Sequence, residues 1–347
     1  MVTIIQDLPD FSFSSTLPNL KFRTDFLTMV VKFYRHNEGE KEELFSEKFA
    51  VDKEGVIEIT TIGELLEPYL EKKLNQEFSY RIVDAQEEVS KTFRVQYCRA
   101  EIDIPAAAFL KNFFLTTMQG DKSILLDTPE FIHFYEDTPS SVVAQVVYEV
   151  EGVIQKEEKI LKTQTTAHVI NTLEVSPYLL EKEGAKLIEY TIKADARNQR
   201  YIIDYQSVEA RPRLLFTNSF GCQETFLCKG TLELESKITR SAGWVNSQLR
   251  NFDTQEERIY KANTGYMTPA VANWAEDLIR SKEIYLLNDR TPGKEIVIVD
   301  SKVNRSMRFD ELPSFTFDYQ LAQRNHNVLL FKEAGRIFDA SFDITFN

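Results

Sequence analysis

The sequence predicts a mainly β protein: two tandem immunoglobulin-like β-sandwich units, then a β-rich C-terminal domain, a barrel or a sheet, with one flanking helix. The aromatic residues favour strands, because Phe and Tyr number 25 and 14 against 2 Trp and fit half-buried pleated surfaces. At 347 residues the chain exceeds the size of one hydrophobic core. A Pro-Tyr-Leu turn followed by a Tyr-x-Ile strand also occurs twice, about 110 residues apart.

This repeat sets the predicted domain boundaries. They are residues 1–99 for the first β-sandwich unit, 100–127 for a linker with a short helix, 128–210 for the second β-sandwich unit, and 211–347 for the C-terminal domain with its helix near 268–281.

The first unit is built from short apolar runs separated by turn-forming residues. Strands are expected at 29–35, 44–51, 55–60 and 92–98. A helical segment precedes the repeated strand, and Pro68 is expected to limit it to short turns, because proline lacks the N–H. The alternation of Phe78, Tyr80 and Ile82 then predicts a strand with one buried face.

The second unit follows the same order. Strands are expected at 131–136, 142–151 and 201–208, with a further hairpin reaching Ile170. Ser176 is predicted to cap a helical turn that starts at Pro177, and Ile188, Tyr190 and Ile192 repeat the alternation of the first unit.

The repeated tyrosines are typical of a tyrosine corner, the motif at which immunoglobulin-like sandwiches cross between sheets. We expect Tyr80 and Tyr190 to lie on equivalent strands and to bond to backbone a few residues upstream. Between the units, Pro105 followed by Ala-rich sequence, with Phe109, Phe113 and Phe114 at helical spacing, predicts a short amphipathic helix that packs the units together.

The C-terminal domain has no copy of this repeat. A long strand is expected across 224–238, where Leu232 and Leu234 alternate with glutamates. One helix over 268–281 is predicted by Thr268 at the N-cap and Pro269 in the first turn. Further strands are expected at 283–288, 295–301, 314–322 and 338–347.

Charge separates the chain into two parts. Residues 1–210 hold 23 basic and 36 acidic side chains, whereas residues 211–347 hold 18 of each. An acidic surface disfavours binding to nucleic acid, because phosphate contacts need basic residues. The start of the chain has no basic and apolar leader, so we expect cytoplasmic synthesis without a signal peptide, and no apolar run has the length of a membrane helix.

The side chains that carry chemistry form no recognised catalytic, cofactor or metal motif. The four His and the three Cys have no ligand spacing, so we expect no metal and no cofactor, with Cys98, Cys222 and Cys228 as small buried residues in a reducing compartment. Cys222 and Cys228 would face one side if they shared a strand. Ser219 lies in a turn-like context without a nearby His, which favours a structural turn over a nucleophile. We therefore expect no enzyme.

Carbohydrate binding is the alternative that remains open. Acidic pairs such as Glu256–Glu257 and Asp310–Glu311 are too common in this chain to locate glycosidase chemistry. Trp244 and Trp274 are candidate sugar platforms, although Trp274 belongs to the apolar face of the predicted helix.

Four stretches resemble a family of proteins encoded in Bacteroidetes phages and prophages, which are taken to be tail-associated or other virion components. They are LPDFSFSSTLPNLKFRTD (8–25), YCRAEIDIPAAAFLKNFFLTT (97–117), LLFTNSFGCQETFLCKGTLE (214–233) and DELPSF (310–315). The resemblance implies a structural or adaptor role in a virion, with other virion proteins or copies of itself as partners through residues 211–347. A carbohydrate-binding or adhesion module built on tandem sandwiches is the rival reading.

Overall fold

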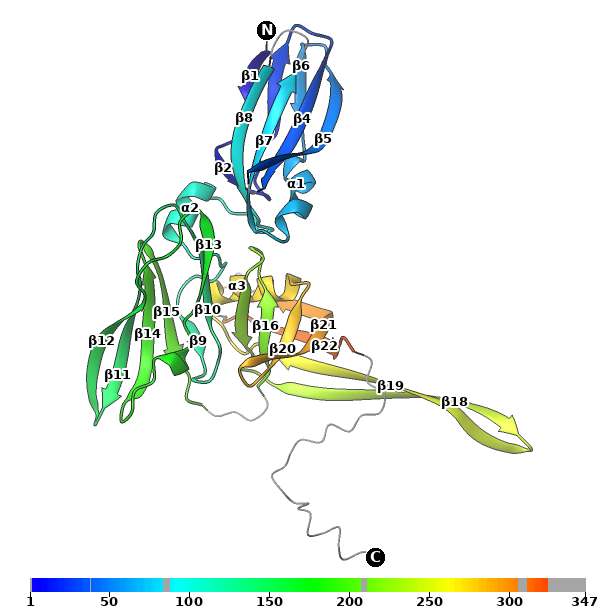
Figure 1. The fold of residues 1–347 in the computed structure, drawn as a ribbon. Helices are drawn as coiled ribbons and strands as arrows, with labels where there is room; N and C mark the ends of the chain where they lie inside the picture. The colour runs from blue at the N-terminus through cyan, green and yellow to red at the C-terminus, as the bar shows by residue number, and fades with distance from the viewer. Residues whose placement is uncertain (1, 38, 84–87, 207–210, 305–310, 324–347) are drawn as a thin grey trace, which may run out of the picture.

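The computed structural model describes residues 2–37, 39–83, 88–206, 211–304 and 311–323. The fold is mainly β, as predicted, with two sandwich units, a linker and a C-terminal sheet following one another along the chain (Figure 1). No helix within the described residues has the length and apolar character to cross a membrane.

The first unit is a sandwich of two sheets with strand orders β1-β3-β6 and β2-β8-β7-β4-β5. Its strands are β1 (Val2–Gln6), β2 (Phe11–Phe13), β3 (Leu20–Thr24), β4 (Thr28–Asn37), β5 (Glu40–Ala50), β6 (Val56–Ile59), β7 (Asn75–Val83) and β8 (Glu88–Gln96). Strand β2 runs parallel to β8, and the other neighbours are antiparallel. Two facing sheets with this order form an immunoglobulin-like sandwich.

The second unit has the same strand order except that no described strand corresponds to β1, and β10-β13 faces β12-β11-β14-β15-β9. Its strands are β9 (Lys122–Ile124), β10 (Phe131–Glu136), β11 (Val142–Val150), β12 (Val153–Lys162), β13 (Val169–Glu174), β14 (Lys186–Ala194) and β15 (Arg197–Ile203). Strand β9 is parallel to β15, as β2 is to β8. Tyr80 on β7 and Tyr190 on β14 therefore lie on equivalent strands, as predicted.

The two Pro-Tyr-Leu turns precede these equivalent strands. In the first unit the turn ends α1 (Ile62–Leu70), a regular helix that continues past Pro68 and is longer than we expected. In the second unit it forms the 3₁₀ turn η1 (Pro177–Leu179). The turn starts as predicted, with Ser176 at the N-cap and Pro177 in the first turn. The Ser176 side chain makes no capping bond, because its hydroxyl accepts from the Glu130 N–H at 2.9 Å and donates to Glu174 instead.

The tyrosine hydroxyls meet different acceptors in the two units. Tyr190 donates to the backbone oxygen of Val175 at 2.7 Å, fifteen residues upstream. Tyr80 instead donates to the Asp7 carboxylate at 2.8 Å, so the predicted backbone bond is wrong there. The connection between β1 and β2 brings an acidic side chain over β7, and that side chain takes the hydroxyl.

The predicted alternation in the second unit is wrong at one position, because a β-bulge shifts the register there. The register between β11 and β14 shifts next to Tyr148, which lies opposite Leu187. Leu187, Tyr190 and Ile192 are buried, whereas Ile188 is half-buried. The extra residue of a bulge changes which side chain faces the core, and simple counting by two placed Ile188 there.

The C-terminal region is an open sheet with the order β17-β16-β20-β21-β22-β19-β18. Its elements are β16 (Arg213–Thr217), β17 (Gln223–Leu227), β18 (Leu232–Val245), β19 (Gln248–Asn263), α3 (Pro269–Arg280), β20 (Ile284–Asn288), β21 (Thr291–Asn304) and β22 (Ser314–Leu321). Helix α3 starts as predicted, with the Thr268 side chain accepting from the Val271 N–H. The strand expected at 338–347 lies outside the described residues.

Strands β18 and β19 form a hairpin that extends far beyond the sheet (Figure 1). The continuous strand expected across 224–238 is wrong, because the chain turns between β17 and β18 at Gly230, where a Cβ atom would overlap the Asn263 side chain. Strand β22 pairs with β19 over residues 260–263. Beyond that point no other described strand pairs with the hairpin, and we call residues 236–258 the arm.

The linker contains α2 (Ala106–Asn112), the predicted helix. Its Phe109 ring lies 5.5 Å from Phe13 of the first unit and 5.3 Å from Phe220 of the C-terminal region. Tyr135 of the second unit and Cys98 belong to the same buried group, which we call the junction cluster. The helix thus packs three parts of the chain together, where the sequence predicted two.

Candidate functional site

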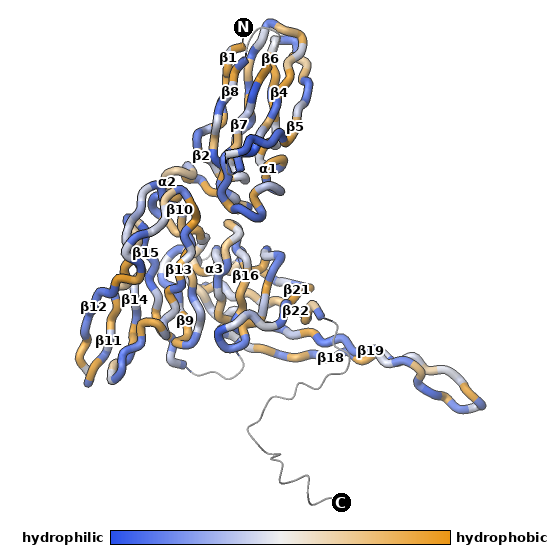
Figure 2. Tube along the Cα trace, viewed as in Figure 1, coloured by the Kyte–Doolittle hydropathy of each residue, from blue (hydrophilic) through white to orange (hydrophobic). Residues whose placement is uncertain are grey.

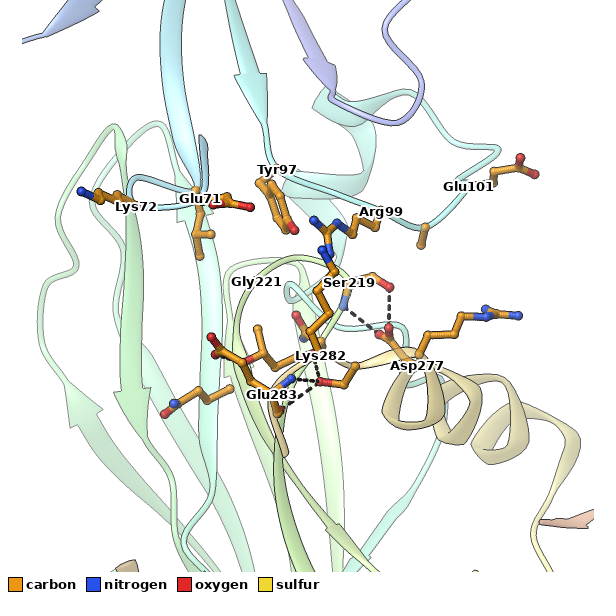
Figure 3. A pocket seen from close by; sticks show the side chains of 17 residues that line it. Glu71, Lys72, Tyr97, Arg99, Glu101, Ser219, Gly221, Asp277, Lys282 and Glu283 are labelled. Atoms are coloured by element: carbon orange, nitrogen blue, oxygen red, sulfur yellow. Dashed lines mark hydrogen bonds between the residues drawn. The ribbon is translucent and has the colours of Figure 1, made fainter. Parts of the chain in front are cut away.

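A cleft of about 1110 Å³ lies between the first unit and the C-terminal region. Figure 3 shows its walls: the end of α1 and the exit of β8 on one side, the turn between β16 and β17 and the end of α3 on the other. Acidic and basic side chains are equal in number around it, namely Glu71, Glu101, Asp277 and Glu283 against Lys72, Arg99, Arg280 and Lys282. The cleft therefore favours no ligand of one charge.

Ser219 and Asp277 are bonded to each other in this cleft (Figure 3). The Ser219 hydroxyl donates to Asp277 Oδ1, and Oδ2 accepts from the Ser219 N–H and the Thr117 hydroxyl, both at 3.1 Å. A nucleophilic serine needs a base that takes its proton, whereas this carboxylate is occupied in holding a turn against α3 and the linker. Ser219 is thus a structural residue.

The turn around Ser219 is fastened on its other side as well. The Asn218 side chain accepts from the backbone N–H groups of Phe220 and Cys222 at 2.9 and 3.0 Å. The Ser219 carbonyl accepts from the Arg99 N–H at 2.9 Å, across the boundary with the first unit. Gly221 has a φ of 76°, and a Cβ there would overlap Leu74. The polar wall of the cleft is a joint between two parts of the chain.

A second group of polar side chains, the buried polar cluster, joins the second unit to the C-terminal region. Lys122 bonds to Glu130 at 2.8 Å, and both side chains are at least nine-tenths buried. The Lys122 ammonium also lies 4.8 Å from the centre of the Trp274 ring, a cation–π distance. Trp274 Nε1 donates to Glu224 at 2.5 Å, and the Thr225 hydroxyl donates to Glu130.

Burial dominates the electrostatics of this cluster. It raises the pKa of Glu130, and it raises the pKa of Glu224 to about 6, in each case against the attraction of Lys122. Raised carboxyl pKa values are common at catalytic sites. The adjoining cavity measures about 20 Å³, which is room for one water molecule, so the cluster is a structural junction. Nothing in the sequence pattern singled out Lys122, Glu130 or Glu224, because they belong to three separate elements.

The three histidines within the described residues lie at two separate places. His133 is buried between Thr172, at 2.9 Å from Nδ1, and the Gln223 carbonyl, at 3.0 Å from Nε2, and burial lowers its pKa. His36 and His168 line a shallow hollow between the first two units, and His326 lies outside the described residues. Among the described residues no group of three His, Cys, Asp or Glu could hold a metal ion.

The three cysteines are buried, as predicted. Burial raises the pKa of the Cys98 thiol to about 12 and raises those of Cys222 and Cys228 further, so none is a thiolate nucleophile. The last two flank β17 and do not share a face, because Cys222 joins the junction cluster and Cys228 packs in the C-terminal core.

The candidate carbohydrate residues are also separated. Trp274 is buried, whereas Trp244 is 75% exposed near the tip of the arm. Glu256 pairs with Arg258 on the arm, and Glu257 accepts from Gln320 at 2.7 Å. Asp310 lies outside the described residues, and the neighbouring Glu311 is exposed. Trp244 and Trp274 therefore form no common platform for a sugar.

The arm exposes more large apolar side chains than a solvated hairpin needs. Trp244 lies opposite Leu249, so both share one face near the tip. Phe252, 75% exposed, packs its ring edge near Gly243 on the other face. Apolar positions recur along the arm out to its tip (Figure 2). The exposed apolar residues of β18 and β19 are Leu234, Ile238, Trp244, Val245, Leu249 and Phe252.

No protein-family model and no curated protein matches this sequence. Among solved structures, the chain is similar to a chimeric titin Z1Z2 functionalized with a KLER exogenous peptide from decorin, at 11% identity and a TM-score of 0.18. The alignment covers 59% of this chain and 97% of that one. At this TM-score the likeness carries no argument about function.

Proposed function

We propose that this chain is a structural or adaptor component of a larger assembly and that it acts through protein–protein contacts made by its C-terminal region. One observation carries the proposal: a two-stranded arm that no other described strand accompanies and that exposes large apolar side chains on both faces.

The physical argument starts from stability. A two-stranded hairpin in water is at best marginally stable, and a long exposed strand edge invites pairing with another chain. Burying one large apolar side chain contributes about 1.5–3 kcal/mol. Docking Trp244, Leu249 and Phe252 on a partner would therefore favour association, while the arm exposes them at a cost in the free chain.

The charge distribution supports the same assignment. The C-terminal region, with 18 basic and 18 acidic residues, can pack closely against a partner, whereas residues 1–210, with 23 and 36, would repel a like surface. The proposed role in a phage rests on the sequence resemblance. One of the resembling stretches, residues 214–233, directly precedes the arm. A tail or baseplate component is the role that agrees with this resemblance.

Light scattering on the full chain, alone and mixed with the products of its neighbouring genes, tests this proposal. We expect a complex that the triple substitution Trp244→Ser, Leu249→Ser and Phe252→Ser abolishes. The matched control is Val297→Ser with Val299→Ser, which removes exposed apolar residues from β21 in the same sheet. A complex that survives the arm substitutions would refute the role of the arm, and a monomer in every mixture would refute assembly.

The carbohydrate alternative now depends on Trp244, since Trp274 is buried. An exposed ring near a hairpin tip can stack on a sugar. Trp fluorescence during titration with soluble oligosaccharides separates the two functions: a saturable change that Trp244→Phe removes would favour sugar binding over assembly.

A further inference from the structure

The proposed function leaves open what the arm binds, and the inference below rests on it. The arm, residues 236–258, contains four basic side chains (Lys237, Arg240, Arg250 and Arg258) and three acidic ones (Asp253, Glu256 and Glu257), and Lys237 lies opposite Glu257. The whole chain has a net charge of -13. The arm is therefore an apolar projection without the acidic excess of the rest of the protein, so it can meet an acidic surface without like-charge repulsion.

A second exposed apolar strip lies on β12, at the open edge of the five-stranded sheet of the second unit. Val153, Ile154 and Ile160 are exposed by 61%, 56% and 65%. Edge strands usually avoid such side chains, because they promote pairing with another chain. The strip and the arm thus share the two properties of a docking strand, a free edge and exposed apolar groups.

Charge favours contact between these two surfaces. Residues 128–210, which contain β12, hold 14 acidic and 8 basic side chains, so two such units repel each other, whereas the nearly charge-balanced arm is not repelled. Strand β12 itself is mixed, with Glu157 and Glu158 among three lysines. The contact itself then comes from the apolar side chains and from the two free strand edges.

The positions of the two surfaces decide between one copy and two. The arm points away from the body, and β12 lies at the opposite end of the molecule (Figure 1), so a chain cannot reach its own β12. Pairing of two arms with each other would leave the β12 strip exposed, and pairing of two β12 edges would bring two acidic units together, which is unfavourable. Contact between opposite ends of two copies avoids both problems.

We propose that the arm of one copy docks on the β12 edge of the second unit of another copy, head to tail. Such a contact is heterologous, so it generates a ring if the rotation closes and an open filament if it does not.

Two variants of the full chain test this geometry. The arm variant carries Trp244→Ser and Leu249→Ser, and the edge variant carries Ile154→Ser and Ile160→Ser. All four positions are exposed, so folding is checked by circular dichroism. In sedimentation experiments at increasing concentration we expect the wild type to form oligomers and each variant to stay monomeric. An equimolar mixture of the two should form heterodimers and nothing larger, because one intact arm meets one intact edge.

The other outcomes are decisive too. An edge variant that assembles like the wild type, or a mixture that stays monomeric, overturns the head-to-tail contact. A wild type that stays monomeric alone but binds a neighbouring gene product through its arm overturns this inference and leaves the proposed function standing. A chain that binds neither a second copy nor a neighbouring gene product overturns both the inference and the proposed function. Reversing Lys237 and Arg240 to glutamate should weaken assembly without changing the apolar contact, and Val297→Ser with Val299→Ser should leave it unchanged.

Discussion

Replacing Glu224 with glutamine is expected to stabilise this protein above about pH 6. The carboxylate is buried on β17 and accepts from Trp274 Nε1 at 2.5 Å. Burial raises its pKa from 4.5 to about 6. Because the folded state then binds the proton more tightly than the unfolded state, the stabilisation from this group is complete below pH 4.5 and is lost as the pH rises through 6.

The size of the effect follows from the same values. The interval from 4.5 to about 6 corresponds to about 2 kcal/mol, at about 1.4 kcal/mol per pKa unit. Glutamine keeps the acceptor for the indole N–H of Trp274. Its amide group faces the cavity of about 20 Å³ that Glu224 lines, where a water molecule can accept from it.

Urea unfolding followed by Trp fluorescence measures this difference. A Trp244→Phe background leaves Trp274, which contacts Glu224, as the single Trp. Glu224→Gln should raise the free energy of unfolding by about 2 kcal/mol at about pH 8 and by much less at about pH 4. His133 titrates in both proteins, and its contribution cancels in the difference.

The control is Glu235→Gln, where the effect has the opposite direction. Lys261 bonds to this exposed carboxylate and lowers its pKa, so the substitution should reduce stability at neutral pH. If the gain in free energy of unfolding from Glu224→Gln does not depend on pH, or if the variant loses stability at about pH 8, the inference that the buried Glu224 charge destabilises the folded state is refuted.

The remaining predictions concern the joints of the fold. Tyr190→Phe should cost about 1 kcal/mol or more in urea unfolding, because it leaves a buried carbonyl without its donor. Tyr80→Phe should cost about 1 kcal/mol and depend on salt, since its acceptor is the half-exposed Asp7 carboxylate. Arg197→Met should cost about 3–5 kcal/mol, because it removes the positive charge that pairs with the buried Glu136 carboxylate. Gly63→Ala should lower the melting temperature, because its Cβ would overlap a backbone oxygen near β2.

Each of these has a clear contrary result. Equal salt dependence for the two tyrosine variants would mean that their acceptors do not differ in charge. Arg197 also donates to the Leu110 carbonyl of α2 at 2.9 Å, and an Arg197→Met protein as stable as the wild type would show that its guanidinium is not needed between α2 and the second unit. An unchanged melting temperature for Gly63→Ala would contradict the close approach at α1.

The repeated units could be predicted because their signals are local. The Pro-Tyr-Leu turns and the alternation around Tyr80 and Tyr190 depend on neighbours in sequence. They correctly predicted that the two tyrosines lie on equivalent strands. The prediction that Ile188 faces the core failed, because the bulge is set by the pairing with strand β11. The prediction of a backbone acceptor for the Tyr80 hydroxyl failed, because its acceptor Asp7 lies 73 residues away in the sequence.

The functional features were harder to predict for the same reason. Strand periodicity indicated strands around the arm, but it does not say whether a strand has a sheet beside it, and that absence of described neighbours is what distinguishes the arm. The buried polar cluster combines Lys122, Glu130 and Glu224 from separate elements. Each looks like an ordinary surface residue in the sequence.

Chemical cross-linking between copies tests the central claim most directly. The native cysteines are buried with raised pKa values, so new surface cysteines will react selectively with a short bismaleimide. We predict that a copy with Val245→Cys on the arm links to a copy with Ile154→Cys on β12, and that Leu65→Cys on the first unit, also exposed, gives no product with the same arm. Equal yields from Leu65→Cys and Ile154→Cys, or no intermolecular product from Ile154→Cys, would contradict the account.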